Sequence, residues 1–216
     1  IVMQALMSVM CFGVNIIFGT VSTEAVTAYG VYYKIQQFVF FAAFGMNNAM
    51  IPIISFNYGK GDRRRIDEGI RYGMIDTLVI MGIGLLALQL FAQPLIGIFA
   101  LSAETQALCL RAIRIITLGY LFVGANIAYQ GIFQALGCGI RSLILSLVRL
   151  IVVALPLAWV FAQCMNAEAI IWAAFPVAEG VALIVGLILM RQVKGLRLER
   201  LSSPGGFMAG PEDRTA

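Results

Sequence analysis

The 216-residue sequence contains no histidine, and only 12% of its residues are charged. Without histidine the chain cannot form a Ser–His–Asp triad, a histidine-ligated haem site or the usual zinc sites. Any proton transfer would have to use carboxylates. The four cysteines are widely spaced and form no CxxC pair, which indicates neither a disulfide framework nor a zinc site. We expect no cofactor and no enzymatic activity, because the sequence shows no metal cluster and no nucleophile–base pair.

Apolar residues are abundant instead: 61% of the sequence is hydrophobic, and the mean hydropathy is +0.91. A soluble domain has about 25% charged and about 45–50% apolar residues. A soluble fold of this size could not bury so much apolar surface, because most residues of a small domain touch water. The net charge of +4 is modest, and the basic residues lie in several short connectors. This distribution favours a membrane protein over a nucleic-acid-binding protein.

Six apolar stretches are separated by connectors with turn or charge signals. They cover residues 1–20, 25–56, 70–92, 105–136, 141–163 and 169–190. A spanning helix needs about 20 residues, and only helices or closed barrels satisfy backbone hydrogen bonds in a bilayer. We predict an all-α polytopic membrane protein, with a bundle of six transmembrane helices over 1–192 and a polar cytoplasmic tail over 193–216. Pro52 and Pro156 are the expected kink positions.

The basic residues of the connectors lie on one side of these stretches. They occupy the connectors after the second and fourth stretches and the tail, at Lys60, Arg63, Arg64, Arg65, Arg71, Arg141, Arg191, Lys194, Arg197, Arg200 and Arg214. The other connectors carry Glu24, Glu104 and Glu168 and no Lys or Arg. By the positive-inside rule the basic side is cytoplasmic, which places both ends of the chain on the cytoplasmic side of the cell membrane. The glycines around Lys60 lack the spacing of a phosphate-binding loop, so this connector is interpreted as a turn.

Polar residues inside the apolar stretches fall on single helical faces. They include Gln4, Ser8, Cys11 and Asn15 in the first stretch, Tyr33, Lys34, Gln37, Asn47 and Asn48 in the second, Asn126, Gln130 and Gln134 in the fourth, and Ser142, Ser146 and Arg149 in the fifth. Such residues are functional candidates, because polar groups are costly in a membrane. The alternative is that they only join neighbouring helices by hydrogen bonds. Several stripes in one small bundle favour a shared polar interior.

Glu179 is the acidic residue deepest in any stretch, near the middle of the sixth. At about 1.5 Å per residue, Arg149 lies about 12 Å and Glu179 about 17 Å from the inner ends of their helices. At these depths Arg149 and Glu179 can form an ion pair, and Lys34 is a rival partner for Glu179. One interpretation is a fixed structural pair. The other is a carboxylate that exchanges a proton or Na⁺ for a cationic substrate as access alternates between the two sides.

Three segments resemble the multidrug and toxic compound extrusion (MATE) transporters. The first segment, residues 25–65, resembles the signature that follows the family's seventh helix. Its sequence is AVTAYGVYYKIQQFVFFAAFGMNNAMIPIISFNYGKGDRRR. Their tenth and eleventh helices resemble YQGIFQALGCGIRSLILSLVR at 129–149 with the following Pro156, and their twelfth resembles WAAFPVAEG at 172–180. The resemblance covers residues 1–192. It implies the C-terminal lobe of a twelve-helix, two-lobe transporter, which agrees with a chain that begins inside an apolar run without an initiator Met.

The resemblance also implies a function and some site residues. Members export cationic, lipophilic compounds in exchange for H⁺ or Na⁺, by rocking of two lobes around a central cleft. Gln4 and Asn15 match polar residues of the family's seventh helix, and Glu179 matches an acid often found on its twelfth. Some branches carry acids on the seventh and tenth helices, where this sequence has only amides. Coupling within this lobe then depends on Glu179, while coupling through the N-terminal lobe stays open.

The expected partners are the lipid bilayer, the N-terminal lobe and a small cationic substrate, without nucleic acid. Tyr33, Tyr129 and Trp172 are candidate cation–π rings, with simple packing as the alternative. Two other functions stay open. A lipid-linked oligosaccharide flippase would favour a cleft rich in Arg and Lys, for which only Lys34 and Arg149 are candidates. A non-transporting membrane subunit would show no carboxylate-dependent flux.

Overall fold

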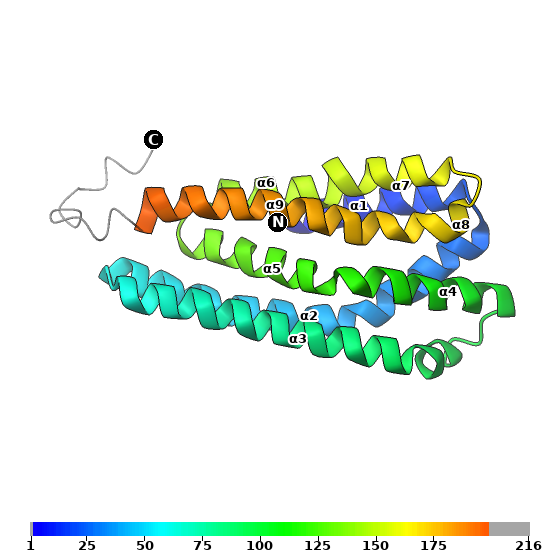
Figure 1. Cartoon of the computed structure of the whole chain (residues 1–216), viewed down its shortest axis with the longest axis horizontal. Coiled ribbons are helices and arrows are strands. Elements are labelled where there is room, and N and C mark those ends of the chain that lie inside the picture. The colour runs from blue at the N-terminus through cyan, green and yellow to red at the C-terminus, as the bar shows by residue number, and fades with distance from the viewer. Residues whose placement is uncertain (1, 199–216) are drawn as a thin grey trace.

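The computed structural model describes residues 2–198, with side chains from residue 5 onward, and this part is helical without strands. The helices are α1 (Val2–Gly19), α2 (Thr23–Lys60), α3 (Arg63–Gly97), α4 (Ala103–Ile116), α5 (Tyr120–Ala135), α6 (Gly139–Leu147), α7 (Ala154–Ala162), α8 (Ala167–Ile170) and α9 (Ala174–Val193). Short 3₁₀ or π segments join α4 to α5, α6 to α7 and α8 to α9. The described chain is therefore a bundle of long rods that run along one axis (Figure 1). Each rod is one helix or two consecutive helices joined by such a segment.

The rods have the length and surface of membrane-spanning helices. Five rods of the described chain are long and apolar enough to cross a membrane: Thr23–Lys60, Arg63–Gly97, Ala103–Ala135, Gly139–Ala162 and Ala167–Leu198. The remaining helix, Ala5–Gly19, is apolar but shorter. Large apolar side chains point away from the bundle, with Phe38 81% exposed and Leu90 74% exposed. The predicted all-α polytopic membrane fold is confirmed.

Several helices extend beyond the predicted apolar stretches. α3 begins at Arg63 rather than at residue 70, and it continues past a non-helical residue, Phe91, to Gly97. The last rod continues as a π segment to Leu198, inside the segment predicted as a polar tail. Charged residues such as arginine favour helices as much as leucine does, and Leu198 is fully buried against the inner core. Residues 199–216 of the predicted tail lie outside the described part of the chain.

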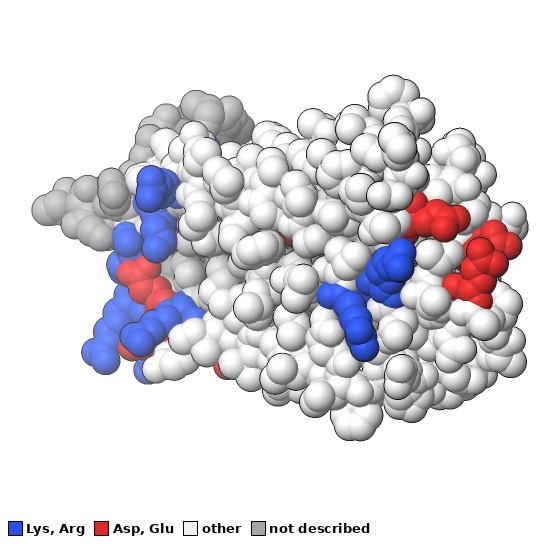
Figure 2. Space-filling model, turned by 45° about the vertical axis from the view of Figure 1, so that its right-hand side comes forward, with Lys and Arg blue, Asp and Glu red and all other residues white. Residues whose placement is uncertain are grey.

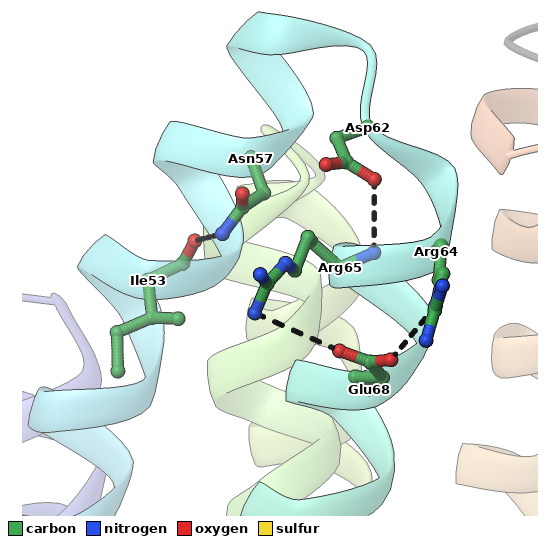
Figure 3. Close-up of polar contacts among 6 residues, drawn as sticks. All are labelled: Ile53, Asn57, Asp62, Arg64, Arg65 and Glu68. Atoms are coloured by element: carbon green, nitrogen blue, oxygen red, sulfur yellow. Dashed lines mark hydrogen bonds and ion pairs between the residues drawn. The ribbon is translucent and has the colours of Figure 1, made fainter.

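The turn between α2 and α3 explains how the two longest helices pack as an antiparallel pair. Gly61 ends α2 with φ of 72°, a left-handed conformation that favours glycine. Asp62 begins α3, and its Oδ1 accepts a hydrogen bond from the backbone N–H of Arg65 at 3.1 Å (Figure 3). Arg63 and Arg64 form ion pairs one turn later, with Asp67 and Glu68. The basic connector is therefore a capped helical turn, as predicted, and not a phosphate loop.

The two predicted kink positions behave differently. α2 passes through Pro52 as one helix. The rod that contains Pro156 is interrupted by a π-helical segment, Val148–Val153, directly before α7. A proline ring cannot accommodate the normal hydrogen bond to the carbonyl four residues earlier, and the π segment shifts the bonding there. This segment carries Arg149.

Two hydrophobic clusters fill the interior, one toward each end of the bundle. The outer cluster contains Phe18, Tyr29, Trp172, Ala43 and Phe175 among others, and the inner one contains Met50, Ile132, Phe133, Leu145 and Ala182. Between them lies a layer of polar side chains that we call the polar belt. It consists of Asn47 on α2, Asn126 and Gln130 on α5, Arg149 on the π segment and Glu179 on α9.

Charged side chains occupy the two ends of the molecule. Basic residues gather at the end of the α2–α3 turn, mixed with a few acidic ones, and acidic residues gather at the opposite end (Figure 2). Figure 2 also shows basic side chains within the otherwise uncharged surface between the ends. Arg111 and Arg114, which fall inside the fourth predicted stretch, are exposed on α4. The orientation was predicted from basic residues in the connectors and the tail, so these two arginines were not counted.

Candidate functional site

The centre of the polar belt is an ion pair between two rods. Arg149 Nε lies 3.0 Å from Glu179 Oε1. Asn126 Nδ2 donates to Glu179 Oε2 at 2.8 Å and to the Glu179 backbone carbonyl at 3.0 Å. The predicted ion pair between Arg149 and Glu179 is confirmed in its geometry, and Asn126 adds a neutral donor from a third rod.

Both charged side chains are withdrawn from the surface. The side chain of Arg149 is 4% exposed and that of Glu179 is 14% exposed. Neither Nε–H nor Nη1 of Arg149 is aligned with a hydrogen-bond acceptor among the described residues, so the attraction to Glu179 is ionic. A buried charge that loses its only opposite charge is strongly destabilised. A proton or cation bound to Glu179 would therefore raise the free energy of the buried Arg149 charge.

A small cavity of about 60 Å³ borders this ion pair. Aromatic rings form much of its wall, with the amides of Gln36 and Gln37 on α2. The rings belong to Tyr29, Tyr32, Tyr33, Phe40, Tyr120 and Phe175. Tyr32 and Tyr120 lie with their hydroxyl oxygens 3.5 Å apart, and Tyr29 stacks on Phe175 with 5.7 Å between ring centroids. The wall offers π faces and hydroxyl groups to a cation that approaches Glu179.

A second, more open groove of about 530 Å³ lies between α1 and α2. Its polar lining contains Ser8, Cys11, Asn15, Tyr33 and Gln37, beside the rings of Phe12, Phe41 and Phe44. Tyr33 and Gln37 line both this groove and the cavity at Glu179. The two spaces therefore meet at α2.

Close helix contacts hold the ion pair in place. A Cβ atom added at Gly119 would lie 2.9 Å from the backbone Cα of Pro176, one turn before Glu179 on α9. A Cβ atom added at Gly186 would lie 2.9 Å from the ring of Tyr129. Small residues allow membrane helices to approach this closely. The two glycines therefore bring α9 against α5 on either side of Glu179 and Asn126.

The structure separates the predicted site residues into two groups. Glu179, Arg149 and Tyr33 line the cavity. Asn126 donates to Glu179, and Gln130 is buried one turn from Asn126. Asn15 lies in the open groove, where its Nδ2 donates to the Cys11 carbonyl at 2.8 Å. Gln4 is in the first turn of α1, and its side chain lies outside the described part of the chain.

Lys34 and Gln134 lie away from the ion pair. Lys34 is exposed on α2 and forms no ion pair with Glu179, so its prediction as the rival partner of Glu179 was wrong. The physical reason is rotation along α2, since Tyr32 and Tyr33 occupy the face toward the cavity. Gln134 is exposed at the far end of α5, where its Nε2 donates to the Ser142 hydroxyl at 3.3 Å. It joins α5 to α6.

The predicted aromatic residues also divide. Trp172 is fully buried against Phe18, with 5.0 Å between ring centroids, and its Nε1 donates to the Glu168 carbonyl at 2.8 Å. Tyr129 stacks on Phe133 beside α9. These two rings pack in the interior, and only Tyr33 of the three lines the cavity.

Three tyrosines of this region were missed as site residues. Tyr29, Tyr32 and Tyr120 line the cavity, whereas Asn47, a polar residue noted in the sequence, belongs to the polar belt. Tyr29, Tyr32 and Tyr33 are spaced by three and four residues, a spacing that indicates one helical face. That spacing was the available signal. Within the described residues, no cluster of three or more Cys, Asp or Glu could hold a metal ion.

Comparisons with known proteins agree on one family. The MatE family model matches residues 1–160. The multidrug export protein MepA of Staphylococcus saprophyticus is 21% identical over 188 residues, which are 87% of this chain and 41% of MepA. The FAD transporter of Shewanella oneidensis is 24% identical over 135 residues, which are 62% of this chain and 30% of that protein.

Solved structures show the same fold. An outward-facing structure of a multidrug resistance MATE family transporter superposes with a TM-score of 0.84 at 22% identity, over 93% of this chain and 45% of that chain. The chain thus spans less than half the length of the relatives it matches and has the fold of one transporter lobe. Since the family model covers most of the sequence, this multi-pass membrane protein belongs to the MatE family.

Proposed function

We propose that the transporter formed with this lobe is a secondary antiporter, which exports lipophilic cations in exchange for H⁺ or Na⁺ by alternating access. The observation that carries the proposal is the ion pair between Arg149 and Glu179, at 3.0 Å inside the polar belt. The multidrug export relatives support the cargo class. The N-terminal lobe, the bilayer and a small cationic substrate are the proposed partners.

The ion pair suggests how a coupling ion drives the change. A proton or Na⁺ on Glu179 competes with Arg149 for the same carboxylate. Once Glu179 is neutralised, Arg149 is a buried charge without an opposite charge, which is costly in a low-dielectric interior. The π segment that carries Arg149 can relieve this cost by moving relative to α9, and such segments are frequent at functional sites. Loading of the ion thereby favours one arrangement of the rods.

The groove between α1 and α2 is the proposed substrate surface. Its aromatic and polar lining suits an apolar cation, and it meets the cavity at Tyr33 and Gln37. Competition between substrate and coupling ion then takes place across these two residues. The basic end of the bundle is proposed to face the cytoplasm, so that both ends of the chain lie inside.

The alternative functions have less support. A flippase for a pyrophosphate-linked lipid needs several buried cations without partners. Among the described residues Arg149 is the buried cation, and Glu179 neutralises it. A non-transporting subunit has no need for a buried ion pair beside a cavity.

The proposal is tested with Glu179→Gln in the full-length protein. We expect this variant to lose ion-driven efflux of a cationic dye at least tenfold per molecule of protein in the membrane, because the amide cannot exchange a proton or Na⁺. Efflux is measured in inverted vesicles with an imposed pH or Na⁺ gradient.

The matched control is Glu104→Gln, which removes an exposed carboxylate at the start of α4. It is expected to transport as the unmodified protein does. Undiminished ion-driven efflux by Glu179→Gln would overturn the proposal, as would an equal loss in both variants.

A further inference from the structure

A polar stripe on α3 has no part in the site described above. Arg65, Glu68, Tyr72 and Asp76 follow one another at spacings of three or four residues, which places them on one face of the helix. Beyond Arg71, Asp76 is the one charged residue that α3 carries before it ends at Gly97. A carboxylate in an otherwise apolar membrane helix is costly and marks a functional position by default.

Asp76 has no partner that offsets this cost. It is exposed, and no described residue forms an ion pair or a hydrogen bond with its carboxylate. Glu68 differs, because Arg64 Nε lies 3.1 Å and Arg65 Nη1 lies 3.9 Å from its carboxylate oxygens (Figure 3). Arg64 and Arg65 thus balance the charge of Glu68, whereas no described residue balances the charge of Asp76.

These residues line a groove of about 350 Å³ between α2 and α3. The α2 side supplies Met46, Met50, Ile53 and Asn57, and the α3 side supplies the polar stripe. Asn57 Nδ2 donates to the Ile53 carbonyl at 2.8 Å, so one of its two amide N–H groups is already used (Figure 3). The groove therefore combines a flexible apolar wall with one uncompensated negative charge. Methionine side chains adapt to ligands of varied shape.

We propose that this groove is a binding site for lipophilic monocations, separate from the cavity at Glu179. The charge of the ligand lies at Asp76, its apolar body packs on Met46, Met50 and Ile53, and the ring of Tyr72, which is 60% exposed, adds a cation–π contact. The site extends the proposed export of lipophilic cations, because it would hold such compounds at the membrane boundary before they reach the central cleft.

The order of charges along α3 selects a monocation over a phospholipid headgroup. Asp76 lies about 16 Å further from the α2–α3 turn than Arg65 does. In a zwitterionic phospholipid the ammonium lies on the water side of its phosphate. Binding its phosphate at Arg65 and its ammonium at Asp76 would reverse this order. A ligand with a single positive charge and an apolar body has no such conflict.

The test measures occupancy of this groove directly. Ile53, which is 55% exposed in the groove, is replaced by Cys in full-length protein whose native cysteines are changed to Ala, and labelling by N-ethylmaleimide is followed with and without tetraphenylphosphonium. We expect the cation to slow labelling of Ile53→Cys. Adding Asp76→Asn should raise at least tenfold the tetraphenylphosphonium concentration that halves the labelling rate. Adding Asp67→Asn, which removes an exposed carboxylate of α3 outside the groove, should change it less than twofold.

Two further controls keep the result decisive. Phe56→Cys, at an exposed position outside the groove, should not be protected. The neutral compound triphenylphosphine oxide should not protect Ile53→Cys, and this comparison needs no change at Asp76. Equal protection with and without Asp76→Asn, or by the neutral compound, would overturn the proposal. Because the readout is labelling and not efflux, failure of the antiporter proposal would appear separately, in the Glu179→Gln experiment.

Discussion

At the scale of single residues, Glu179 uses its two carboxylate oxygens for two different rods. Oε1 lies beside Arg149 on the π segment, and Oε2 accepts from Asn126 on α5. Each partner compensates for part of the desolvation of the carboxylate, but only Arg149 carries a charge. Removing Glu179 and removing Arg149 are therefore not equivalent, since each leaves a different group without its partner.

Arg149→Gln should destabilise the protein, because it leaves the Glu179 carboxylate buried without an opposite charge. Breaking a buried ion pair from one side costs about 3–5 kcal/mol. The double variant Arg149→Gln with Glu179→Gln removes both charges and should recover most of this loss. Thermal unfolding of the purified variants at one scan rate measures the effect.

The double variant also serves as the control, because coupling between the two positions appears as non-additivity. Additive losses from the two single variants would contradict a direct ion pair. A single variant as stable as the parent protein would contradict the burial of the charge.

The sequence reduced the partner of Glu179 to two candidates, Arg149 and Lys34, but did not predict the surroundings of the pair. The depths of Arg149 and Glu179 followed from counting residues along apolar helices, and this arithmetic does not depend on packing. Which face of α2 points inward does depend on packing. The count gave Lys34 and Tyr33 similar depths, whereas the structure exposes Lys34 and turns Tyr33 toward the cavity. A stripe on one helix predicts a shared face, not the neighbour that this face contacts.

At the scale of helices, close approaches decide the position of α9. Gly119 lies in the 3₁₀ turn that joins α4 to α5 and faces the backbone of Pro176. Its φ of −79° is accessible to any residue, so the backbone conformation does not require glycine. The requirement comes from contact, because the neighbouring atom belongs to the backbone of α9 and cannot rotate away.

Gly119→Ala should therefore destabilise the protein by about 1–3 kcal/mol, the usual cost of overpacking. Gly30→Ala is the matched control, because a Cβ at Gly30 has nothing within 4 Å. In that helix the change should be neutral or stabilising by up to about 1 kcal/mol. Unfolding midpoints of the two variants are compared with the parent protein. Equal midpoints for Gly119→Ala and Gly30→Ala would show that α9 does not depend on this contact.

Helix existence was predictable from apolar runs, whereas helix ends and interruptions were not. The apolar signal marks the part of a helix that contacts lipid, but α3 continues in both directions beyond that part. Pro52 and Pro156 appeared equivalent in the sequence, yet only the rod with Pro156 contains a π segment. The local effect of a proline depends on whether neighbouring helices satisfy the freed carbonyl, and one sequence does not show this.

At the scale of the whole molecule, two apolar clusters enclose a polar layer. The belt crosses α2 between Ala43 and Met50 and crosses α9 between Phe175 and Ala182, at the changes from the outer to the inner cluster. A layer held by a few polar contacts costs less to rearrange than a continuous apolar core. In the antiporter proposed above, the belt is therefore the expected plane for a motion of the rods, and ion occupancy at Glu179 would control it.

The orientation of the whole bundle is testable through a native thiol. Cys164 is exposed in the connector between α7 and α8, near Glu168 and opposite to the basic end. If the basic end is cytoplasmic, a membrane-impermeant maleimide should label Cys164 in intact cells, and Cys164→Ser should abolish this labelling. Lys60→Cys in the Cys164→Ser background, at the opposite end of the bundle, should react only after permeabilisation. The exposed Arg111 and Arg114 make this test necessary, because they add positive charge to the outer half of α4. The reverse labelling pattern would mean that these arginines outweigh the connector charges, and the direction of alternating access proposed above would then be inverted.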